Sequence, residues 1–292
     1  MALKYDIFVS PSIIAQPIRQ GDKPFYWSPI ASTLIQGSKY AVLVDTAITV
    51  QQNNDLADWV ESKLRPQNIE LKAIYITHGH ADHFLGVNIL QSRFPSAQVL
   101  ATKGTAAHIK QQLEPTFFAR FWAGFFPGDQ LPTGIRADAT FTEVLDDNKF
   151  ELEGHLLQAV EVGHTDTFDS TVLWVPDLRL AVCGDVVYGD VHLYLVEANS
   201  RTKRMEWVAA LEKVQALKPE SVIAGHKREG EPDGAHQIDF SIEYIRTFQS
   251  LLDSGVNETG PLYDAMMEKY GGRVNSHALL GSCWAAEAAG WK

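Results

Sequence analysis

Three histidines and an aspartate lie within the short segment ITHGHADHF, residues 76 to 84. Imidazole and carboxylate groups are the usual ligands of zinc and related divalent ions. Alternate side chains at the end of a strand point the same way, so His78 and His80 can bind one ion while Asp82 and His83 bind a second. Four such groups directly after the buried-strand pattern AIYIT predict a metal site.

Three further candidates follow apolar runs elsewhere in the chain. His164 comes after LLQAVEVG, Asp185 ends LAVCGD, and His226 ends SVIAGH. Each follows a glycine, where the backbone can turn sharply and leave a polar side chain at the edge of a sheet. Together with the cluster at 78 to 83, these residues predict the rest of the metal site.

The chemistry expected of such a site is hydrolysis. Two divalent ions can share a water, lower its pKa towards about 7, and polarise a carbonyl group. An ester, lactone, thioester or amide can then be cleaved without a serine or cysteine nucleophile. Asp82 can both bind a metal and act catalytically, by orienting the attacking water and passing a proton to the leaving group.

Alternating strand and helix patterns must position these residues. Helical spacing of apolar residues predicts helices over 53–66, 84–95 and 204–217. Runs of aliphatic and β-branched residues predict strands over 32–37, 40–46, 71–77, 97–102, 155–163, 170–176, 178–187 and 221–226. The pattern indicates an α/β protein with two halves of similar rhythm. No linker marks a boundary, so we expect one domain over 1–292.

Composition excludes several classes of partner. The 292 residues are 45% hydrophobic and carry a formal net charge of −11, with a pI near 5.3. This charge argues against nucleic acid and against an anionic membrane surface, because both require clustered Lys and Arg. There is no signal-peptide pattern, no apolar stretch of transmembrane length, and only two cysteines, Cys183 and Cys283. We therefore expect a cytoplasmic protein.

Aromatic residues are concentrated in EPTFFARFWAGFFPGD, within a helical insert expected over about 104–135. Their spacing predicts one broad aromatic face on a helix, which is either an ordinary core face, a lid or pocket wall, or a contact in a homodimer. The wall interpretation makes Phe118, Phe121 and Trp122 candidate substrate contacts. Phe25, Tyr26 and Trp27 are expected on a loop before the first hairpin, and Trp27 is a further substrate candidate.

The motifs T-H-x-H-x-D-H, G-H-T, G-D and G-H resemble those of the metallo-β-lactamase-fold superfamily over about residues 25 to 230. The resemblance implies a four-layer αββα sandwich, here with a helical extension over about 237–292. It also implies two Zn²⁺ ions per chain, with Mn²⁺ or Fe²⁺ as alternatives. The implied ligands are His78, His80 and His164 for one ion and Asp82, His83 and His226 for the other, with Asp185 bridging both.

Departures within that family suggest a subtype. Histidine at position 80, where the oxygen-reducing di-iron members have glutamate, favours hydrolysis. Tyr188 stands where the similar acyl-homoserine lactonases carry a tyrosine that contacts the substrate, so it is a candidate catalytic and binding residue. His192 and Tyr194 are further substrate candidates, whereas Asp166 and Asp169 are expected to fix the GHTDTFDS turn.

The sequence therefore predicts a dinuclear zinc hydrolase that opens a lactone or cyclic amide with an apolar or aromatic ring. One alternative is a thioesterase or a β-lactamase-like amidase. A second is a mononuclear-iron persulfide dioxygenase of the same fold. A scarcity of Lys and Arg in the C-terminal region makes glutathione thioesters a poorer match.

Overall fold

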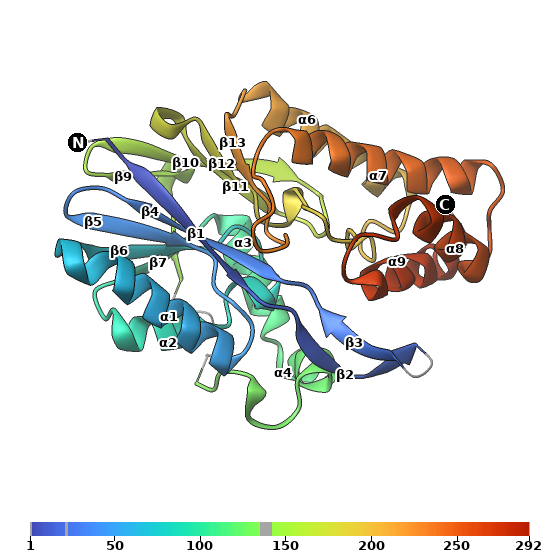
Figure 1. Ribbon diagram of the computed structural model, residues 1–292, viewed down its shortest axis with the longest axis horizontal. Helices are drawn as coiled ribbons and strands as arrows, with labels where there is room; N and C mark the ends of the chain where they lie inside the picture. Colours follow the sequence, from blue (N-terminus) through green and yellow to red (C-terminus); the bar gives the residue numbers. More distant parts are fainter. Residues whose placement is uncertain (1, 21–22, 135–141, 292) are drawn as a thin grey trace.

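The computed structural model describes residues 2–20, 23–134 and 142–291. Two β-sheets lie face to face at its centre (Figure 1). The first sheet has the strand order β1 (Lys4–Ser10), β4 (Ile30–Gln36), β5 (Tyr40–Val44), β6 (Glu70–Tyr75), β7 (Gln98–Ala101) and β8 (Thr142–Val144). The second has the order β13 (Ser221–Ile223), β12 (Leu180–Val182), β11 (Ser170–Val175), β10 (His155–Gly163) and β9 (Lys149–Leu152).

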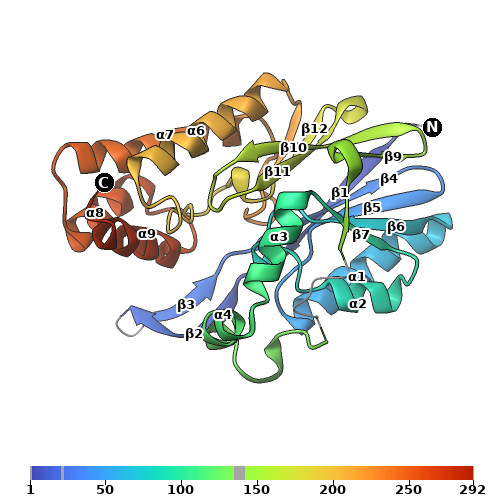
Figure 2. The same cartoon turned by 180° about the vertical axis from the view of Figure 1, so that it is seen from behind.

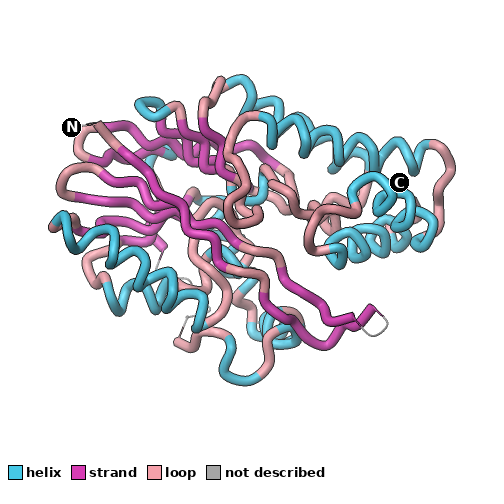
Figure 3. Tube along the Cα trace, in the orientation of Figure 1, coloured by secondary structure: helices cyan, strands magenta, loops and turns pink. Residues whose placement is uncertain are grey.

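Helices cover the outer face of each sheet, as the view from behind also shows (Figure 2). The first sheet is covered by α1 (Val50–Leu64) and α2 (Val87–Arg93), and the second by α6 (Arg201–Ala216) and α7 (His236–Asp253). With the strands coloured separately, the order helix, sheet, sheet, helix is plain (Figure 3). The predicted four-layer αββα sandwich is therefore confirmed.

Three apolar clusters hold these layers together. One lies between the first sheet and its helices, a second between the second sheet and its helices, and a third between the two sheets. The strand β10 contributes to two of them, because successive side chains point to opposite faces. Leu157 and Ala159 join the cluster between the sheets, while Val162 joins the cluster beneath α6.

The helix α1 shows how local sequence begins and ends an element. Thr49 accepts a hydrogen bond from the backbone N–H of Gln52, whose side chain bonds back to the backbone of Thr49, which forms a capping box. The helix buries Leu56 and Val60 and ends at Leu64, before Pro66. The helix ends two residues before the predicted limit at Pro66, and it begins three residues earlier than predicted.

Two predicted strands are shorter than expected. The run 178–187 forms a strand only over Leu180–Val182, and 221–226 only over Ser221–Ile223. Gly184 has φ +48°, so the chain leaves the extended conformation there and makes a 3-10 turn, Gly184–Val186. Asp185, which follows Gly184, therefore lies in this turn and not in the strand.

The aromatic residues Phe25, Tyr26 and Trp27 lie on a strand, so their prediction as a loop was wrong. The strand β3 (Lys23–Trp27) pairs with β2 (Ile13–Gln20) in an antiparallel ribbon, with Ile13 opposite Trp27. Aromatic and β-branched residues favour this extended form once a partner strand is available. The ribbon projects beyond the ends of the two main sheets (Figure 1).

The aromatic insert consists of short helices in place of one long one. These are α3 (Lys103–Gln112), α4 (Pro115–Arg120) and α5 (Trp122–Phe125). The last two are separated at Phe121, so two short helices carry the aromatic residues, whose rings remain in contact across the break. The insert's predicted limit at about 135 falls outside the described residues.

Helices also form the C-terminal region, where α7 is followed by α8 (Thr259–Tyr270) and α9 (Ser276–Ala288). The pair α8 and α9 lies beyond the same end of the sandwich as the β2–β3 ribbon (Figures 1 and 2). Among the described residues, no helix is both long and apolar enough to cross a membrane.

Candidate metal centre

The cluster at 78 to 83 lies in the turn directly after β6. A 3-10 turn, Ala81–His83, brings Asp82 and His83 back towards His78 and His80. Gly79 is needed for space, since a Cβ at this position would lie 2.4 Å from Cγ of His108. All four side chains are buried, with His80 the most exposed at 8%.

Asp185 and His226 reach this turn from the second sheet. A Cβ on Gly184 would lie 2.3 Å from Thr77 Oγ1, and a Cβ on Gly225 would lie 2.4 Å from Asp185 Oδ1. Only glycine permits backbones to approach so closely, which explains why a glycine precedes each of the two polar residues. Strand ends from the two halves therefore converge, as the sequence predicted.

The converging residues form overlapping groups that can bind metal. One group is His78, His80, Asp166 and Asp185, and another is Asp82, His83 and His226, with one ligand atom of each residue within 4.8 Å of the others in its group. Asp185 also links the groups, because its two carboxylate oxygens lie 3.1 Å from Nε2 of His83 and 3.1 Å from Nε2 of His226.

Behind the cluster, Asp45 fixes the orientation of two histidines. Its Oδ2 accepts from Nδ1 of His83 at 3.0 Å and from the hydroxyl of Thr77 at 2.7 Å. Because that hydroxyl proton is used, Thr77 Oγ1 accepts from Nδ1 of His78, 3.0 Å away. Both histidines therefore present the lone pair of Nε2 to the cluster.

The other two histidines are oriented in the same way. The carbonyl oxygen of Pro29 accepts from Nδ1 of His226 at 2.8 Å, which leaves Nε2 facing Asp185. Glu197 Oε1 accepts from Nε2 of His80 at 3.0 Å, which leaves Nδ1 facing Asp166. Each of the four imidazoles thus has an outer partner that fixes its proton on the side away from the cluster.

Four atoms at the centre of the cluster form no hydrogen bond. The unpartnered atoms include Nε2 of His78, Nε2 of His83, Oδ2 of Asp166 and Oδ1 of Asp185, all of them buried. A buried polar atom without a partner costs about 1–3 kcal/mol. Imidazole lone pairs and carboxylate oxygens that face one another in this way fit divalent cations, which would satisfy all four atoms.

The charges of the metal-free chain agree with this interpretation. Burial alone would lower the pKa of His83, but Asp185 and Asp82 outweigh it and hold that pKa well above its usual value. Burial likewise favours a raised pKa for Asp185, yet His226 and His83 hold it well below the usual range. In the metal-free chain His83 therefore carries a second proton, on Nε2 beside Asp185, and a metal ion would displace it.

Two aromatic residues contact the carboxylates of the cluster. Tyr188 donates its hydroxyl proton to Asp185 Oδ2 over 2.5 Å, and burial together with Asp185 raises the pKa of Tyr188 well above its usual value. Trp27 donates its indole N–H to Asp82 Oδ2 over 3.0 Å. Tyr188 therefore keeps its proton at neutral pH, and Trp27 orients a predicted metal ligand.

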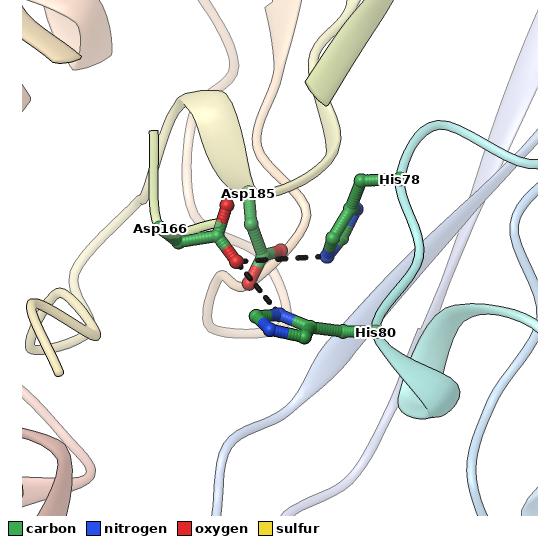
Figure 4. Close-up of side chains that lie close together, drawn as sticks. All are labelled: His78, His80, Asp166 and Asp185. Carbon is green, nitrogen blue, oxygen red and sulfur yellow. Dashed lines mark ion pairs between the residues drawn. The ribbon is translucent and has the colours of Figure 1, made fainter. Parts of the chain in front are cut away.

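Among the described residues, the groups of side chains able to bind metal include Asp166 and do not include the predicted ligand His164. Nδ1 of His164 lies 2.8 Å from the carbonyl oxygen of Thr165, and the ring is partly exposed. Asp166, predicted only to fix a turn, is fully buried beside His78 and His80 (Figure 4). The sequence offered two candidate ligands two residues apart, and spacing alone could not separate them.

The sequence reasoning also missed the outer partners Asp45 and Glu197. Asp45 directly follows the buried strand YAVLV, so it carries the same strand-end signal that identified Asp185. Its φ of +59° is a left-handed conformation that aspartate tolerates better than most residues. No comparable signal marks Glu197, which lies on the loop before α6 and is placed by the tertiary structure alone.

A cavity of about 570 Å³ opens beside the cluster. His80, Asp82, Asp185 and His226 form one end of it. The remaining wall comes from the strand β3, the aromatic insert, the segment between β12 and α6, and the helix α9. Its aromatic residues are Phe25, Trp27, Phe117, Phe121, Trp122, Phe125, Tyr188, Tyr194 and Trp284. The volume is typical of a site for a small organic molecule.

Five of the six predicted substrate contacts other than Tyr188 line this cavity: Trp27, Phe121, Trp122, His192 and Tyr194. Phe118 does not, because it packs against the core beneath the first sheet. Its neighbour Phe117, which had no predicted role, lines the cavity in its place. The residues of α9 were not predicted either, since nothing in the sequence indicates that this helix folds back over the site.

Comparison with known families now gives the decisive observation. The family model described as the metallo-beta-lactamase superfamily matches residues 25–226, which is more than half of the chain. The chain therefore belongs to the metallo-beta-lactamase superfamily. No curated protein matches it in sequence.

Solved structures of the superfamily share the fold of this chain. A metallo-beta-lactamase from Pontibacter korlensis is 16% identical, with a TM-score of 0.54, and the match covers 84% of this chain and 99% of the other. One from Hirschia baltica is 17% identical, with a TM-score of 0.51 and coverage of 84% and 93%. One from Pseudomonas aeruginosa, in a mono-zinc form, is 13% identical, with a TM-score of 0.53 and coverage of 84% and 92%.

Proposed function

We propose that this protein is a dinuclear, metal-dependent hydrolase that opens an uncharged, largely apolar lactone or cyclic amide. The observation that supports the proposal is that a candidate metal cluster lies at the end of an aromatic cavity. Four imidazoles aim lone pairs at a buried group of carboxylates, and this cluster forms the end of an aromatic cavity. Zn²⁺ is the ion we propose, because the donors are imidazole nitrogen and carboxylate oxygen.

When bound, the two ions would supply an activated water and polarise the substrate carbonyl. The chain's own residues do the rest. Asp82, oriented by Trp27, lies where it can hold and transfer a proton at its carboxylate. Tyr188, which is protonated and lines the cavity, can redirect its phenol proton from Asp185 Oδ2 to the carbonyl or leaving oxygen of the substrate. The aromatic wall excludes water from the reacting atoms.

The charge around the cavity indicates an uncharged substrate. Five carboxylates lie at or directly behind the four histidines: Asp45, Asp82, Asp166, Asp185 and Glu197. They are sufficient to balance two divalent cations. Among the described residues, no lysine or arginine lines the cavity. Burial lowers the pKa of His192 to about 4 and also lowers that of His277, so neither ring supplies a positive charge at neutral pH.

A pair of matched substrates tests this point. We expect kcat/KM for a neutral aryl- or alkyl-substituted lactone to exceed that for its carboxylate-bearing analogue by roughly tenfold or more. Placing a carboxylate in an aromatic cavity whose described lining has no lysine or arginine costs several kcal/mol. The neutral amide of the same analogue controls for size. Equal rates for the carboxylate and the amide would contradict an uncharged substrate.

The Tyr188→Phe variant tests the phenol. We expect turnover of the lactone to fall roughly ten- to a thousandfold, the scale for losing one donor that stabilises developing charge. Metal content should stay at the wild-type value, because Tyr188 contacts Asp185 but is not in either group of ligands. An unchanged rate would make Tyr188 a packing residue against Trp207 and His226.

A panel of lactones, lactams, thioesters and β-lactams, with zinc, manganese and iron reconstitution, tests the proposed activity as a whole. Lactone turnover with two zinc ions per chain is the result we expect. One iron per chain with oxygen-dependent turnover would indicate a persulfide dioxygenase instead. We also propose the cytosol as the compartment, which the two free, buried cysteines support.

A further inference from the structure

The position of Asp166 bears on the composition of the metal centre. Its Oδ2 lies 2.8 Å from Nδ1 of His80 and 3.7 Å from Nε2 of His78. Figure 4 shows this oxygen between the two rings, with Asp185 beside it. The carboxylate is completely buried, and its Oδ2 makes no hydrogen bond.

An ion pair between Asp166 and a doubly protonated His80 accounts for the 2.8 Å contact but not for the rest of this geometry. Glu197 fixes one proton of His80 on Nε2, so a neutral His80 presents a lone pair at Nδ1. A lone pair and a carboxylate oxygen 2.8 Å apart repel each other unless a cation or a further proton lies between them. The same oxygen also faces the unpartnered Nε2 of His78, which a single extra proton on His80 would not satisfy. A metal ion satisfies all three atoms at once.

The loop around Asp166 holds the side chain in this position. Oδ1 accepts a hydrogen bond from the hydroxyl of Thr165 at 2.8 Å, which leaves Oδ2 as the free oxygen. The backbone N–H of Thr165 bonds to the carbonyl of Thr167 at 2.7 Å, and the hydroxyl of Thr167 bonds to Glu197 at 2.7 Å. Glu197 in turn contacts His80, so the loop and the histidine are fixed by one network.

His164 stands two residues before Asp166 in the same turn. Gly163, with φ +99°, ends β10, and the ring of His164 then bonds through Nδ1 to the carbonyl oxygen of Thr165. Nδ1 is therefore the protonated nitrogen, because a carbonyl can only accept. Among the described residues, the groups able to bind metal include Asp166 and do not include His164.

We propose that Asp166, and not His164, is the metal ligand contributed by the loop after β10. The first ion would then be bound by His78, His80, Asp166 and the shared Asp185. The second would be bound by Asp82, His83, His226 and the same Asp185. Each ion would have two imidazole nitrogens, one carboxylate of its own and one shared carboxylate. The centre carries one negative charge more than a centre with three histidines at the first ion.

Metal binding by three variants tests this inference. The variants are Asp166→Asn, Asp166→Ala and, as the matched control two residues away, His164→Ala. Each is stripped with a chelator, reloaded with Zn²⁺ and freed of excess ion, and metal per chain is measured by plasma mass spectrometry. Calorimetric titration with Zn²⁺ and the visible spectrum with Co²⁺ give the affinity and the coordination of each ion.

We expect both Asp166 variants to bind one of the two ions at least on the order of 10- to 100-fold more weakly, the loss typical of disturbing even an outer-shell partner. His164→Ala should retain the wild-type stoichiometry, affinity and cobalt spectrum. The opposite pattern, with the ion weakened in His164→Ala and retained in Asp166→Asn, would overturn the assignment, as would unchanged binding in all three. Asp166→Asn keeps the shape of the side chain, and near-UV circular dichroism checks its fold.

This inference rests on the proposed metal centre but not on the proposed substrate. If the protein binds two ions and opens no lactone, the binding experiment still decides between Asp166 and His164. If it binds no ion at all, both the centre and this assignment fail together.

Discussion

Asp185→Asn is expected to lower kcat at least on the order of 10²–10³-fold, the scale for losing one group that acts on charge in the transition state. Asp185 contacts Nε2 of His83, Nε2 of His226 and the hydroxyl of Tyr188, so it belongs to both proposed ligand sets. The amide keeps its shape but carries no negative charge to hold two cations together. Steady-state kinetics on the best lactone of the panel, with metal content measured in parallel, checks this prediction.

Two further variants test whether the loss in Asp185→Asn is specific to the metal cluster. His80→Ala removes another proposed ligand and should give a loss of similar size. Asp58→Asn, on the exposed surface of α1, makes the same chemical change where the side chain pairs with Arg93, and should leave kcat unchanged. Near wild-type turnover in both Asp185→Asn and His80→Ala would mean that the cluster is not the reacting centre.

Asp45→Ala is expected to lower the free energy of unfolding by about 3–5 kcal/mol, the cost of removing one member of a buried, hydrogen-bonded charge network. Asp45 is 1% exposed and accepts from the backbone N–H of Thr77, from its hydroxyl and from Nδ1 of His83. Alanine would also be strained at φ +59° by about 1–2 kcal/mol. Urea unfolding in the presence of a chelator measures the change without a contribution from bound metal.

Asp45→Asn is the matched control for that experiment. Asparagine tolerates the same left-handed backbone and can still accept from Thr77, so its loss of stability should be clearly smaller than that of alanine. A loss below about 0.5 kcal/mol in Asp45→Ala, which is the range of ordinary surface substitutions, would show that Asp45 does not hold His83 in place.

Local signals in the sequence were sufficient for most of the fold and for the core of the site. The four candidate ligands at 78 to 83 lie so close together in the sequence that a shared metal site could be predicted. The apolar run before them predicts the strand that positions them. Asp185 and His226 were located by the same logic, since each stands just past a strand with a glycine before it. These features depend on residues that are close together in the sequence.

Features set by distant contacts were not predictable in the same way. The choice between His164 and Asp166 depends on how β10 leaves its sheet, where the pairing shifts between Glu161 and Gly163. The strand β3 pairs with β2, the strand directly before it, although residues 25–27 were expected to form a loop. Glu197 and the wall formed by α9 reach the site only after the C-terminal helices pack, and no short pattern encodes that packing.

The most direct test of the central claim is an anomalous difference map from crystals of the zinc-loaded protein, recorded above and below the zinc absorption edge. The account predicts two peaks that share Asp185, one bounded by His78, His80 and Asp166 and the other by Asp82, His83 and His226. A map without peaks among these residues, or with its peaks elsewhere in the molecule, would contradict it.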